Sequence, residues 1–134
     1  MDVFIQTINK NIQSNNSIYW AITLNGTDKL IGTICLFDFS DDNLKAEIGY
    51  ELLPDFQGKG IMQEAITEVI DFGFEQMNLK TITAVPSGDN LQSRKLLEKN
   101  NFKIDPVLQA TFVQHEDLAN MVIYSLTKMR LEPH

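Results

Sequence analysis

Apolar residues follow a short period in the first half of the chain. Residues 18–24, 30–39 and 44–53 are rich in β-branched and aromatic side chains and are separated by polar stretches, which is typical of strands. Asn25-Gly26 is a strong turn signal between the first two segments. The acidic, polar residues 40–43 separate the second from the third. Three consecutive strands predict an antiparallel meander.

Elsewhere the apolar positions follow the 3.6-residue period of a helix. Residues 3–13 place their apolar side chains on one helical face, with Asp2 as the N-cap. The longest such pattern covers residues 60–77. Another helix is expected over residues 91–99, where Asn100-Asn101 closes it. The pattern thus predicts one helix before the meander and two after it.

Three further β-rich runs, residues 79–85, 107–113 and 121–126, complete the pattern. The expected order is α-β-β-β-α-β-α-β-β. A meander followed by a strand–helix–strand unit implies an α/β (α+β) fold, a mixed sheet covered by helices. No repeat or linker interrupts the 134 residues, so we treat residues 1–134 as a single domain.

Composition narrows the functional classes. The chain has 18 acidic and 11 basic residues, a net charge of −7, which disfavours nucleic-acid binding and favours a cationic partner such as an amine. Its longest apolar run, residues 18–22, is far short of the ~20 residues of a membrane helix, and no leader is recognised. The single cysteine, Cys35, excludes an internal disulfide, and with two histidines gives no zinc spacing. We expect a cytoplasmic, metal-free domain that does not bind membranes.

A short loop carries the clearest chemical signal. Residues 54–62, PDFQGKGIM, lie between a strand and the long helix. Gly58 and Gly60 let the backbone approach a ligand and direct successive amides at it. The start of the helix adds free N–H groups and the positive end of its dipole. The loop is therefore a candidate pyrophosphate site, although a tight strand-to-helix turn would use the same glycines.

The surrounding blocks resemble a known family. They are AEIGYELLP at residues 46–54, QGKG at residues 57–60, and Asn90 and Ser93 ahead of LLEK at residues 96–99. Together they are similar to the GCN5-related N-acetyltransferase (GNAT) family, within it to the branch that modifies ribosomal-protein N-termini and small amines. This resemblance covers roughly residues 18–126 and implies a GNAT-like, mostly antiparallel sheet flanked by helices.

The resemblance also implies acetyl-CoA as cosubstrate. The third strand would separate from its neighbour after residue 52, and the pantetheine arm would pair with the backbone of Leu52 and Leu53. Asn90 would hydrogen-bond the pantetheine, act as a helix N-cap, or do both. The pyrophosphate would lie on the backbone amides of Gln57, Gly58, Lys59, Gly60, Ile61 and Met62. Met62 departs from the glycine or alanine that the family prefers there.

Acetyl transfer to an amine needs a base and benefits from a proton donor. Glu47 is the candidate base, because a carboxylate inside an apolar strand is disfavoured unless the site uses it. Glu51 shares its face and is the alternative base, as is a bound water; a solvent-facing structural role for Glu47 stays open. Ser93 is the candidate donor, since Leu97 stands where many family members carry a tyrosine.

Other polar or reactive residues receive structural interpretations. Tyr50, Tyr19 and Trp20 are interpreted as core or rim residues, and Cys35 as a buried thiol. His115 and His134 are interpreted as surface residues.

Two functions compete. The resemblance implies an N-acetyltransferase that moves an acetyl group directly from acetyl-CoA to a primary amine, on a protein N-terminus or a small molecule. The alternative is a non-catalytic acyl-CoA-binding domain or a degenerate, truncated relative, because the family usually opens with a strand and a helix that we do not recognise here. An uncovered sheet edge favours self-association, for example as a homodimer.

Overall fold

The computed structural model describes residues 3–11, 17–24, 28–112 and 119–128. Its helices are α1 (Ile61–Glu75), α2 (Leu91–Lys99) and α3 (Pro106–Phe112), and a short 3-10 helix (Pro54–Phe56) follows the fourth strand. Its strands are β1 (Val3–Asn11), β2 (Ser17–Leu24), β3 (Leu30–Phe37), β4 (Lys45–Leu52), β5 (Thr81–Ala84), β6 (Lys103–Ile104) and β7 (Tyr124–Thr127).

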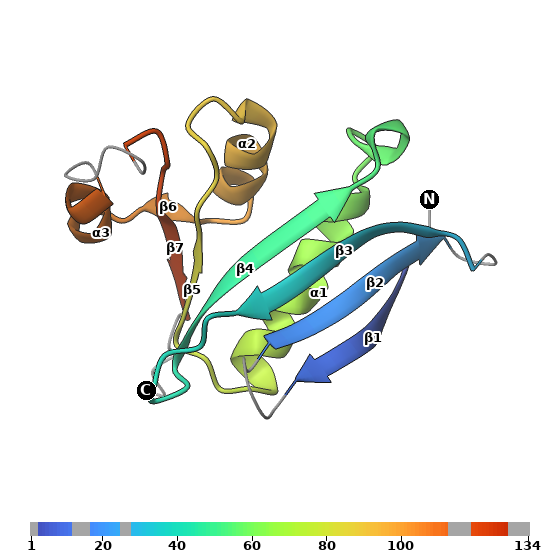
Figure 1. Ribbon diagram of the computed structural model, residues 1–134, viewed down its shortest axis with the longest axis horizontal. Coiled ribbons are helices and arrows are strands. Elements are labelled where there is room, and N and C mark those ends of the chain that lie inside the picture. Colours follow the sequence, from blue (N-terminus) through green and yellow to red (C-terminus); the bar gives the residue numbers. More distant parts are fainter. Residues whose placement is uncertain (1–2, 12–16, 25–27, 113–118, 129–134) are drawn as a thin grey trace, which may run out of the picture.

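The strands form one seven-stranded sheet in the order β1-β2-β3-β4-β5-β7-β6 (Figure 1). β4 and β5 are parallel, and every other neighbouring pair is antiparallel. The predicted meander is confirmed as β2-β3-β4, and the predicted helices over residues 60–77 and 91–99 are confirmed as α1 and α2. A mixed, mostly antiparallel sheet flanked by helices is therefore confirmed.

The helix predicted over residues 3–13 is wrong, because this segment is the edge strand β1. It pairs antiparallel with β2, from Val3↔Leu24 to Asn11↔Ser17, with a register shift between Thr7 and Asn9. The sequence alternation of apolar residues changes phase at the same place, which hid the strand period. Backbone pairing with β2 and the β-branched composition outweigh a helical spacing that a short segment can satisfy by chance.

The strand predicted over residues 107–113 is also wrong, since residues 106–112 form α3. The Asp105 carboxylate caps this helix by accepting hydrogen bonds from the backbone N–H groups of Val107 and Leu108, each at 3.1 Å. Pro106 occupies the first helical position, where its missing N–H costs nothing. Asp-Pro is thus a helix-start signal that outweighs the β propensity of the residues after it.

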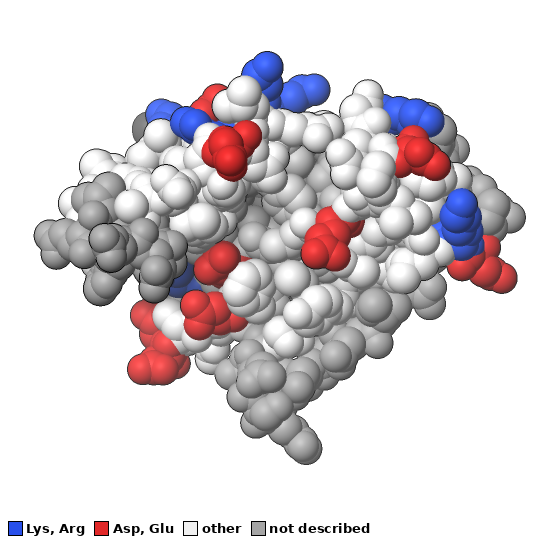
Figure 2. All heavy atoms as spheres, turned by 45° about the horizontal axis from the view of Figure 1, so that its top comes forward, with Lys and Arg blue, Asp and Glu red and all other residues white. Residues whose placement is uncertain are grey.

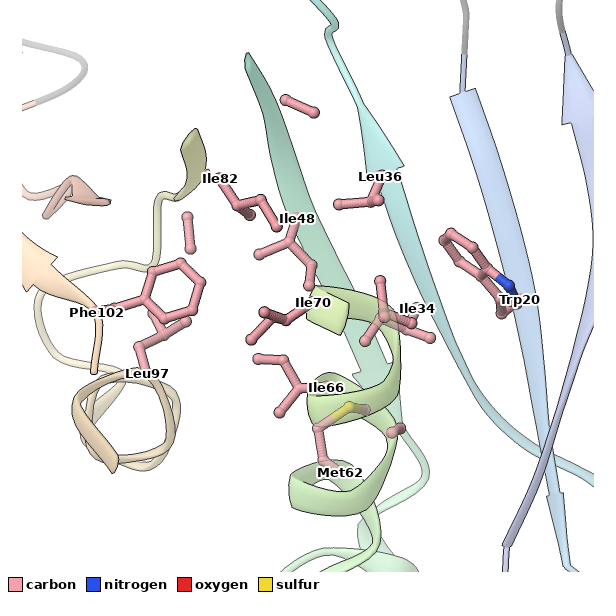
Figure 3. Packing of buried hydrophobic residues seen from close by; sticks show 14 of the residues in the cluster. Trp20, Ile34, Leu36, Ile48, Met62, Ile66, Ile70, Ile82, Leu97 and Phe102 are labelled. Carbon is pink, nitrogen blue, oxygen red and sulfur yellow. The ribbon is translucent and has the colours of Figure 1, made fainter. Parts of the chain in front are cut away.

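α1 packs lengthwise against one face of the sheet and supplies much of the core (Figure 3). Its buried face joins Ile34 and Leu36 of β3 and Ile48 of β4 in one cluster. α2 adds Leu97 to the same cluster, and both Leu97 and Ile34 are fully buried. Burial of this continuous apolar cluster fixes α1 and α2 relative to β4. The buried residues of α1 are Ile61, Met62, Ala65, Ile66, Val69, Ile70, Gly73 and Phe74.

Some sequence-based expectations lie outside the described residues: Asp2 as an N-cap, the Asn25-Gly26 turn, and the placement of His115 and His134. Within the described part of the chain, no helix is long and apolar enough to span a bilayer. The same part holds no group of three or more His, Cys, Asp or Glu residues that could bind a metal ion.

Candidate active site

The candidate site lies where β4 and β5 separate. These strands pair only at Lys45↔Thr81, Ala46↔Ile82 and Glu47↔Thr83. Beyond Glu47, β4 continues to Leu52 beside β3 alone, and Figure 1 shows the two strands diverging. The expectation that the separation begins after residue 52 is therefore wrong, because it begins after Glu47. This stretch of β4 has an open edge on the side of β5.

The backbone of β4 turns alternate residues toward the open edge. Leu53 N–H donates to the carbonyl of Ile31 on the β3 side at 2.8 Å. In an antiparallel ladder the intervening residues face the other way, so the backbone groups of Tyr50 and Leu52 face the open edge. The Leu52 carbonyl accepts a hydrogen bond from Gln57 Nε2 at 2.8 Å. The open edge can thus pair with an extended ligand. One of its backbone acceptors, the Leu52 carbonyl, is already bonded to the Gln57 side chain.

A groove of about 760 Å³ follows this edge, between the end of β4, the loop at residues 57–60 and α2. Among the predicted site residues, Lys59, Ile61 and Glu47 do not form its wall, whereas Glu51, the alternative base, does. Tyr50, which was not predicted as a site residue, also lines it. The predicted residues that line it are Leu52, Leu53, Gln57, Gly58, Gly60, Met62, Asn90 and Ser93. The structure therefore brings the loop, the strand end and α2 together, as the separated motifs suggested.

The loop before α1 has the geometry of an anion site. Gly58 and Gly60 adopt positive φ angles of 75° and 82°. A Cβ at either position would meet no described atom within 4 Å, so the glycines are needed for backbone conformation and not for space. Gly60 is the N-cap of α1, and no side chain in the described part of the chain caps the first turn. The first N–H groups of α1 therefore remain free for an anion, which fits a pyrophosphate.

The two residues that follow Gly60 have buried side chains. Ile61 and Met62 are 1% and 9% exposed and belong to the apolar core. Met62 also lines the groove, so its side chain forms part of the wall at a position where the family pattern prefers glycine or alanine. Lys59 lies on the outside of the loop, with Nζ 5.9 Å from the centroid of the Phe56 ring.

The start of α2 supplies polar groups on the other side of the groove. Asn90 is the N-cap of α2, because its Oδ1 accepts a hydrogen bond from Ser93 N–H at 3.2 Å. Ser93 Oγ lies 2.5 Å from the Tyr50 hydroxyl. Leu97, one turn beyond Ser93, is fully buried in the core. Sequence reasoning missed Tyr50 as a site residue, because its partner comes from a distant segment.

Glu47 lies next to the groove, where the two strands part. It is half-buried, and burial together with the nearby charge of Asp38 raises the pKa of its carboxyl group. Alternation along β4 places Glu47 and Glu51 on one face, opposite Ala46 and Ile48. A raised pKa makes Glu47 a stronger base than an ordinary glutamate.

Cys35 lies on the same face of the sheet as Glu47 and Glu51. Burial raises the pKa of the Cys35 thiol, and the charges of Glu47 and Glu51 add to this effect. Cys35 is half-buried, so the expectation of a buried thiol is wrong.

Basic side chains border the groove although the chain as a whole is acidic. Lys95 and Lys99 of α2 form part of the groove wall. Figure 2 shows Lys and Arg side chains gathered mainly along the upper edge of the displayed face, whereas Asp and Glu side chains also occupy its centre and lower part. The local positive charge suits a phosphorylated ligand better than the net charge suggests.

Comparisons with known proteins identify the family of the chain. A family model described as "Acetyltransferase (GNAT) domain" matches residues 2–103. The uncharacterized N-acetyltransferase YoaA of Bacillus subtilis is 35% identical over 126 residues, which are 94% of this chain and 71% of that protein.

Solved structures share the fold. A ribosomal-protein-S5-alanine acetyltransferase from Vibrio fischeri matches with a TM-score of 0.71 and 23% identity, over 87% of this chain and 64% of that one. The N-acetyltransferase PseH of Campylobacter jejuni, in complex with acetyl coenzyme A, matches with a TM-score of 0.64 and 20% identity, over 84% of this chain and 69% of that one. From the family model and the sequence relative we conclude that this chain belongs to the GNAT acetyltransferase family, for which acetyl-CoA is the cosubstrate.

Proposed function

We propose that this chain is an N-acetyltransferase that transfers an acetyl group from acetyl-CoA to a primary amine. The observation that carries the proposal is the uncapped start of α1, behind two glycines of positive φ, at one end of a groove along an open strand edge. A phosphate site and a main-chain edge in one groove suit a ligand that has both a pyrophosphate and amide groups.

Each part of acetyl-CoA has candidate partners in the groove. The amides of residues 58–62 would bind the pyrophosphate, and Lys95 and Lys99 would attract its charge. The Gln57 N–H already donates to the Pro54 carbonyl at 3.2 Å, so Gln57 would act through its side chain. The backbone of β4 at Tyr50 and Leu52 would pair with the pantetheine as an added strand would. Leu53 N–H already bonds to β3, so Leu53 would act through its side chain or carbonyl. The Asn90 side chain would donate from its amide nitrogen, since its oxygen caps α2.

The protein's own residues would manage the protons. Acetyl-CoA supplies an activated thioester. Glu47 would accept the proton that the attacking ammonium must lose, directly or through a water, and Glu51 is the alternative base. Ser93 would donate a hydrogen bond to the leaving sulfur. Either proton transfer contributes typically about 10²- to 10⁴-fold to the rate.

A non-catalytic acyl-CoA-binding role is the second candidate. Two observations favour it: Glu47 is outside the groove wall, and the buried Leu97 cannot replace the tyrosine that many family members carry. Both functions require the same ligand, so binding alone does not separate them.

Two measurements test the proposal. Acetyl-CoA, but not free acetate, should raise the melting temperature, because a ligand bound only by the folded state stabilises it by about 2.7 kcal/mol at one hundred times its Kd. No shift at millimolar acetyl-CoA would refute both functions. A thiol-release assay with peptides of free N-terminus, polyamines and aminoglycosides then identifies the acceptor. Stabilisation without turnover on any amine would favour the binding role.

A further inference from the structure

Tyr50 and Ser93 form a hydrogen bond across the groove. The Tyr50 hydroxyl and Ser93 Oγ are 2.5 Å apart, although 43 residues separate them in the sequence. Tyr50 comes from β4 at its open edge, and Ser93 from the first turn of α2. Both residues line the groove that we assign to acetyl-CoA. The pair therefore joins the two walls between which the acyl donor would lie.

The chemistry of the two hydroxyl groups differs. A serine hydroxyl does not ionise in the accessible pH range, so Ser93 can give up its proton only if it receives another. A tyrosine phenol has an ordinary pKa of about 10, close to the value of about 8.5 for a thiol. Burial raises the pKa of Tyr50, so the phenol is fully protonated at neutral pH. The raised pKa keeps the proton on Tyr50 but makes the phenol a weaker acid, so it is the contact with Ser93 that allows Tyr50 to replace the serine proton as that proton moves to sulfur.

We propose that Tyr50 and Ser93 form a donor pair for the leaving thiolate, with Ser93 touching the sulfur and Tyr50 acting through Ser93. The inference rests on the proposed acetyltransferase function. As the amine nitrogen bonds to the acetyl carbon, the carbon–sulfur bond breaks and its electron pair goes to sulfur. Sulfur takes the Ser93 proton, Ser93 takes the Tyr50 proton, and water reprotonates the phenolate. The ammonium loses one proton to Glu47 or to water before it attacks, and the acylated nitrogen loses a second proton to water, which balances the proton that water returns to the phenolate.

The chain's other two tyrosines and Leu97 do not supply this proton. Leu97 has no exchangeable proton and is fully buried. The Tyr124 hydroxyl donates to Glu98 Oε2 at 2.6 Å and accepts from Arg94 Nε at 3.1 Å, away from the groove wall. Tyr19, on β2, does not line the groove either. Tyr50 is thus the one tyrosine of the chain's three in the groove wall.

Calorimetry tests the contact without turnover. CoA and desulfo-CoA, which lacks the thiol, are titrated into the wild type, Ser93→Ala and Tyr50→Phe at pH 7 and pH 9. In the wild type the preference for CoA should grow at least fivefold from pH 7 to pH 9, because a thiolate is the better acceptor. In both variants the preference for CoA over desulfo-CoA should be the same at pH 7 and pH 9, and both should still bind desulfo-CoA. If the preference of Tyr50→Phe increases with pH as much as that of the wild type, Tyr50 does not act through Ser93. If the wild type binds neither ligand, the proposed function itself fails, and the pair with it.

Kinetics then separate proton donation from structure. Tyr50→Phe and Ser93→Ala should each lower kcat about 10- to 100-fold with little change in the KM for acetyl-CoA, and the double variant should lose no more than either. Tyr124→Phe is the matched control, because it also removes a buried hydroxyl bonded to α2. It should lower the melting temperature and keep kcat and the CoA preference. Multiplicative losses in the double variant, or wild-type kcat in Tyr50→Phe, would overturn the proposal.

Discussion

Gly60 allows charge and backbone conformation to be separated at the anion site. Its φ angle is 82°, and an added Cβ would meet no described atom within 4 Å. Asparagine and aspartate both tolerate this conformation better than other residues and have nearly the same shape. Gly60→Asn and Gly60→Asp therefore form a matched pair that differs in one negative charge at the start of α1.

The expected magnitude follows from the geometry. Two unit charges 4 Å apart interact by about 1 kcal/mol in water and about 4 kcal/mol at an effective dielectric constant of 20. Gly60 is exposed, so the lower part of this range applies. We expect Gly60→Asp to bind CoA about 1–2 kcal/mol more weakly than Gly60→Asn, which is a factor of about 5 to 30. Gly60→Ala should lower the free energy of unfolding by about 1–2 kcal/mol through the left-handed backbone alone.

The assay is isothermal titration of CoA into both variants at low and high salt. The difference between them should shrink at 0.5 M salt, because screening weakens exposed charge pairs. Without CoA, Gly60→Asp should be more stable to unfolding than Gly60→Asn, because a carboxylate near a helix N-terminus is stabilising. Equal CoA affinities for Gly60→Asn and Gly60→Asp at low salt would show that the phosphates do not lie at this loop.

Three further variants test the base and the connection of α2. Glu47→Gln should lower turnover about 10²-fold near pH 7, with a smaller loss at high pH where the amine is already deprotonated; wild-type turnover at pH 7 would exclude Glu47 as base. Because folding raises its pKa, ionised Glu47 destabilises the fold above the unfolded pKa of about 4.3, so the same variant should unfold at higher urea at pH 7. Asp38→Asn should move the acid limb of the pH–rate profile to lower pH, because the substitution removes a charge that raises the pKa of Glu47. An acid limb at unchanged pH would show that another group causes it. Gln63→Ala should lower the free energy of unfolding by about 1–2 kcal/mol in a denaturant titration, because Gln63 and Asn100 exchange two amide hydrogen bonds, and an unchanged midpoint would show that they add nothing.

The elements predicted best are those whose signals are local. α2 has the expected bounds because Asn90 caps it and its sequence is strongly helical. α1 has a long, regular apolar period that a strand cannot satisfy. The segment that became β1 satisfies either period over its short length, and only pairing with β2 decides between them. α3 was missed because β propensity was given more weight than the Asp105-Pro106 start signal.

The site was predictable where it consists of one short segment and not where it depends on distant contacts. The glycines of the loop carry their own signal, because their positive φ angles need residues without a side chain. The Tyr50–Ser93 hydrogen bond joins two elements far apart in the chain, and nothing in either local sequence indicates it. The place where β4 and β5 part is likewise a property of the sheet and not of either strand alone.

The early separation of β4 from β5 has a consequence for local stability. Among the described residues, three pairs join β4 to β5, and the N–H groups of Lys80 and Thr81 add bonds to the Leu44 carbonyl, so the main-chain connection is confined to one end of the strands. Tyr50 and Gln63 connect α2 to the rest through side chains instead. A ligand that pairs with β4 would act as a missing strand and make the two parts one cooperative unit. Amide hydrogen exchange on β4 at Tyr50 and Leu52 should then slow markedly when the groove is filled.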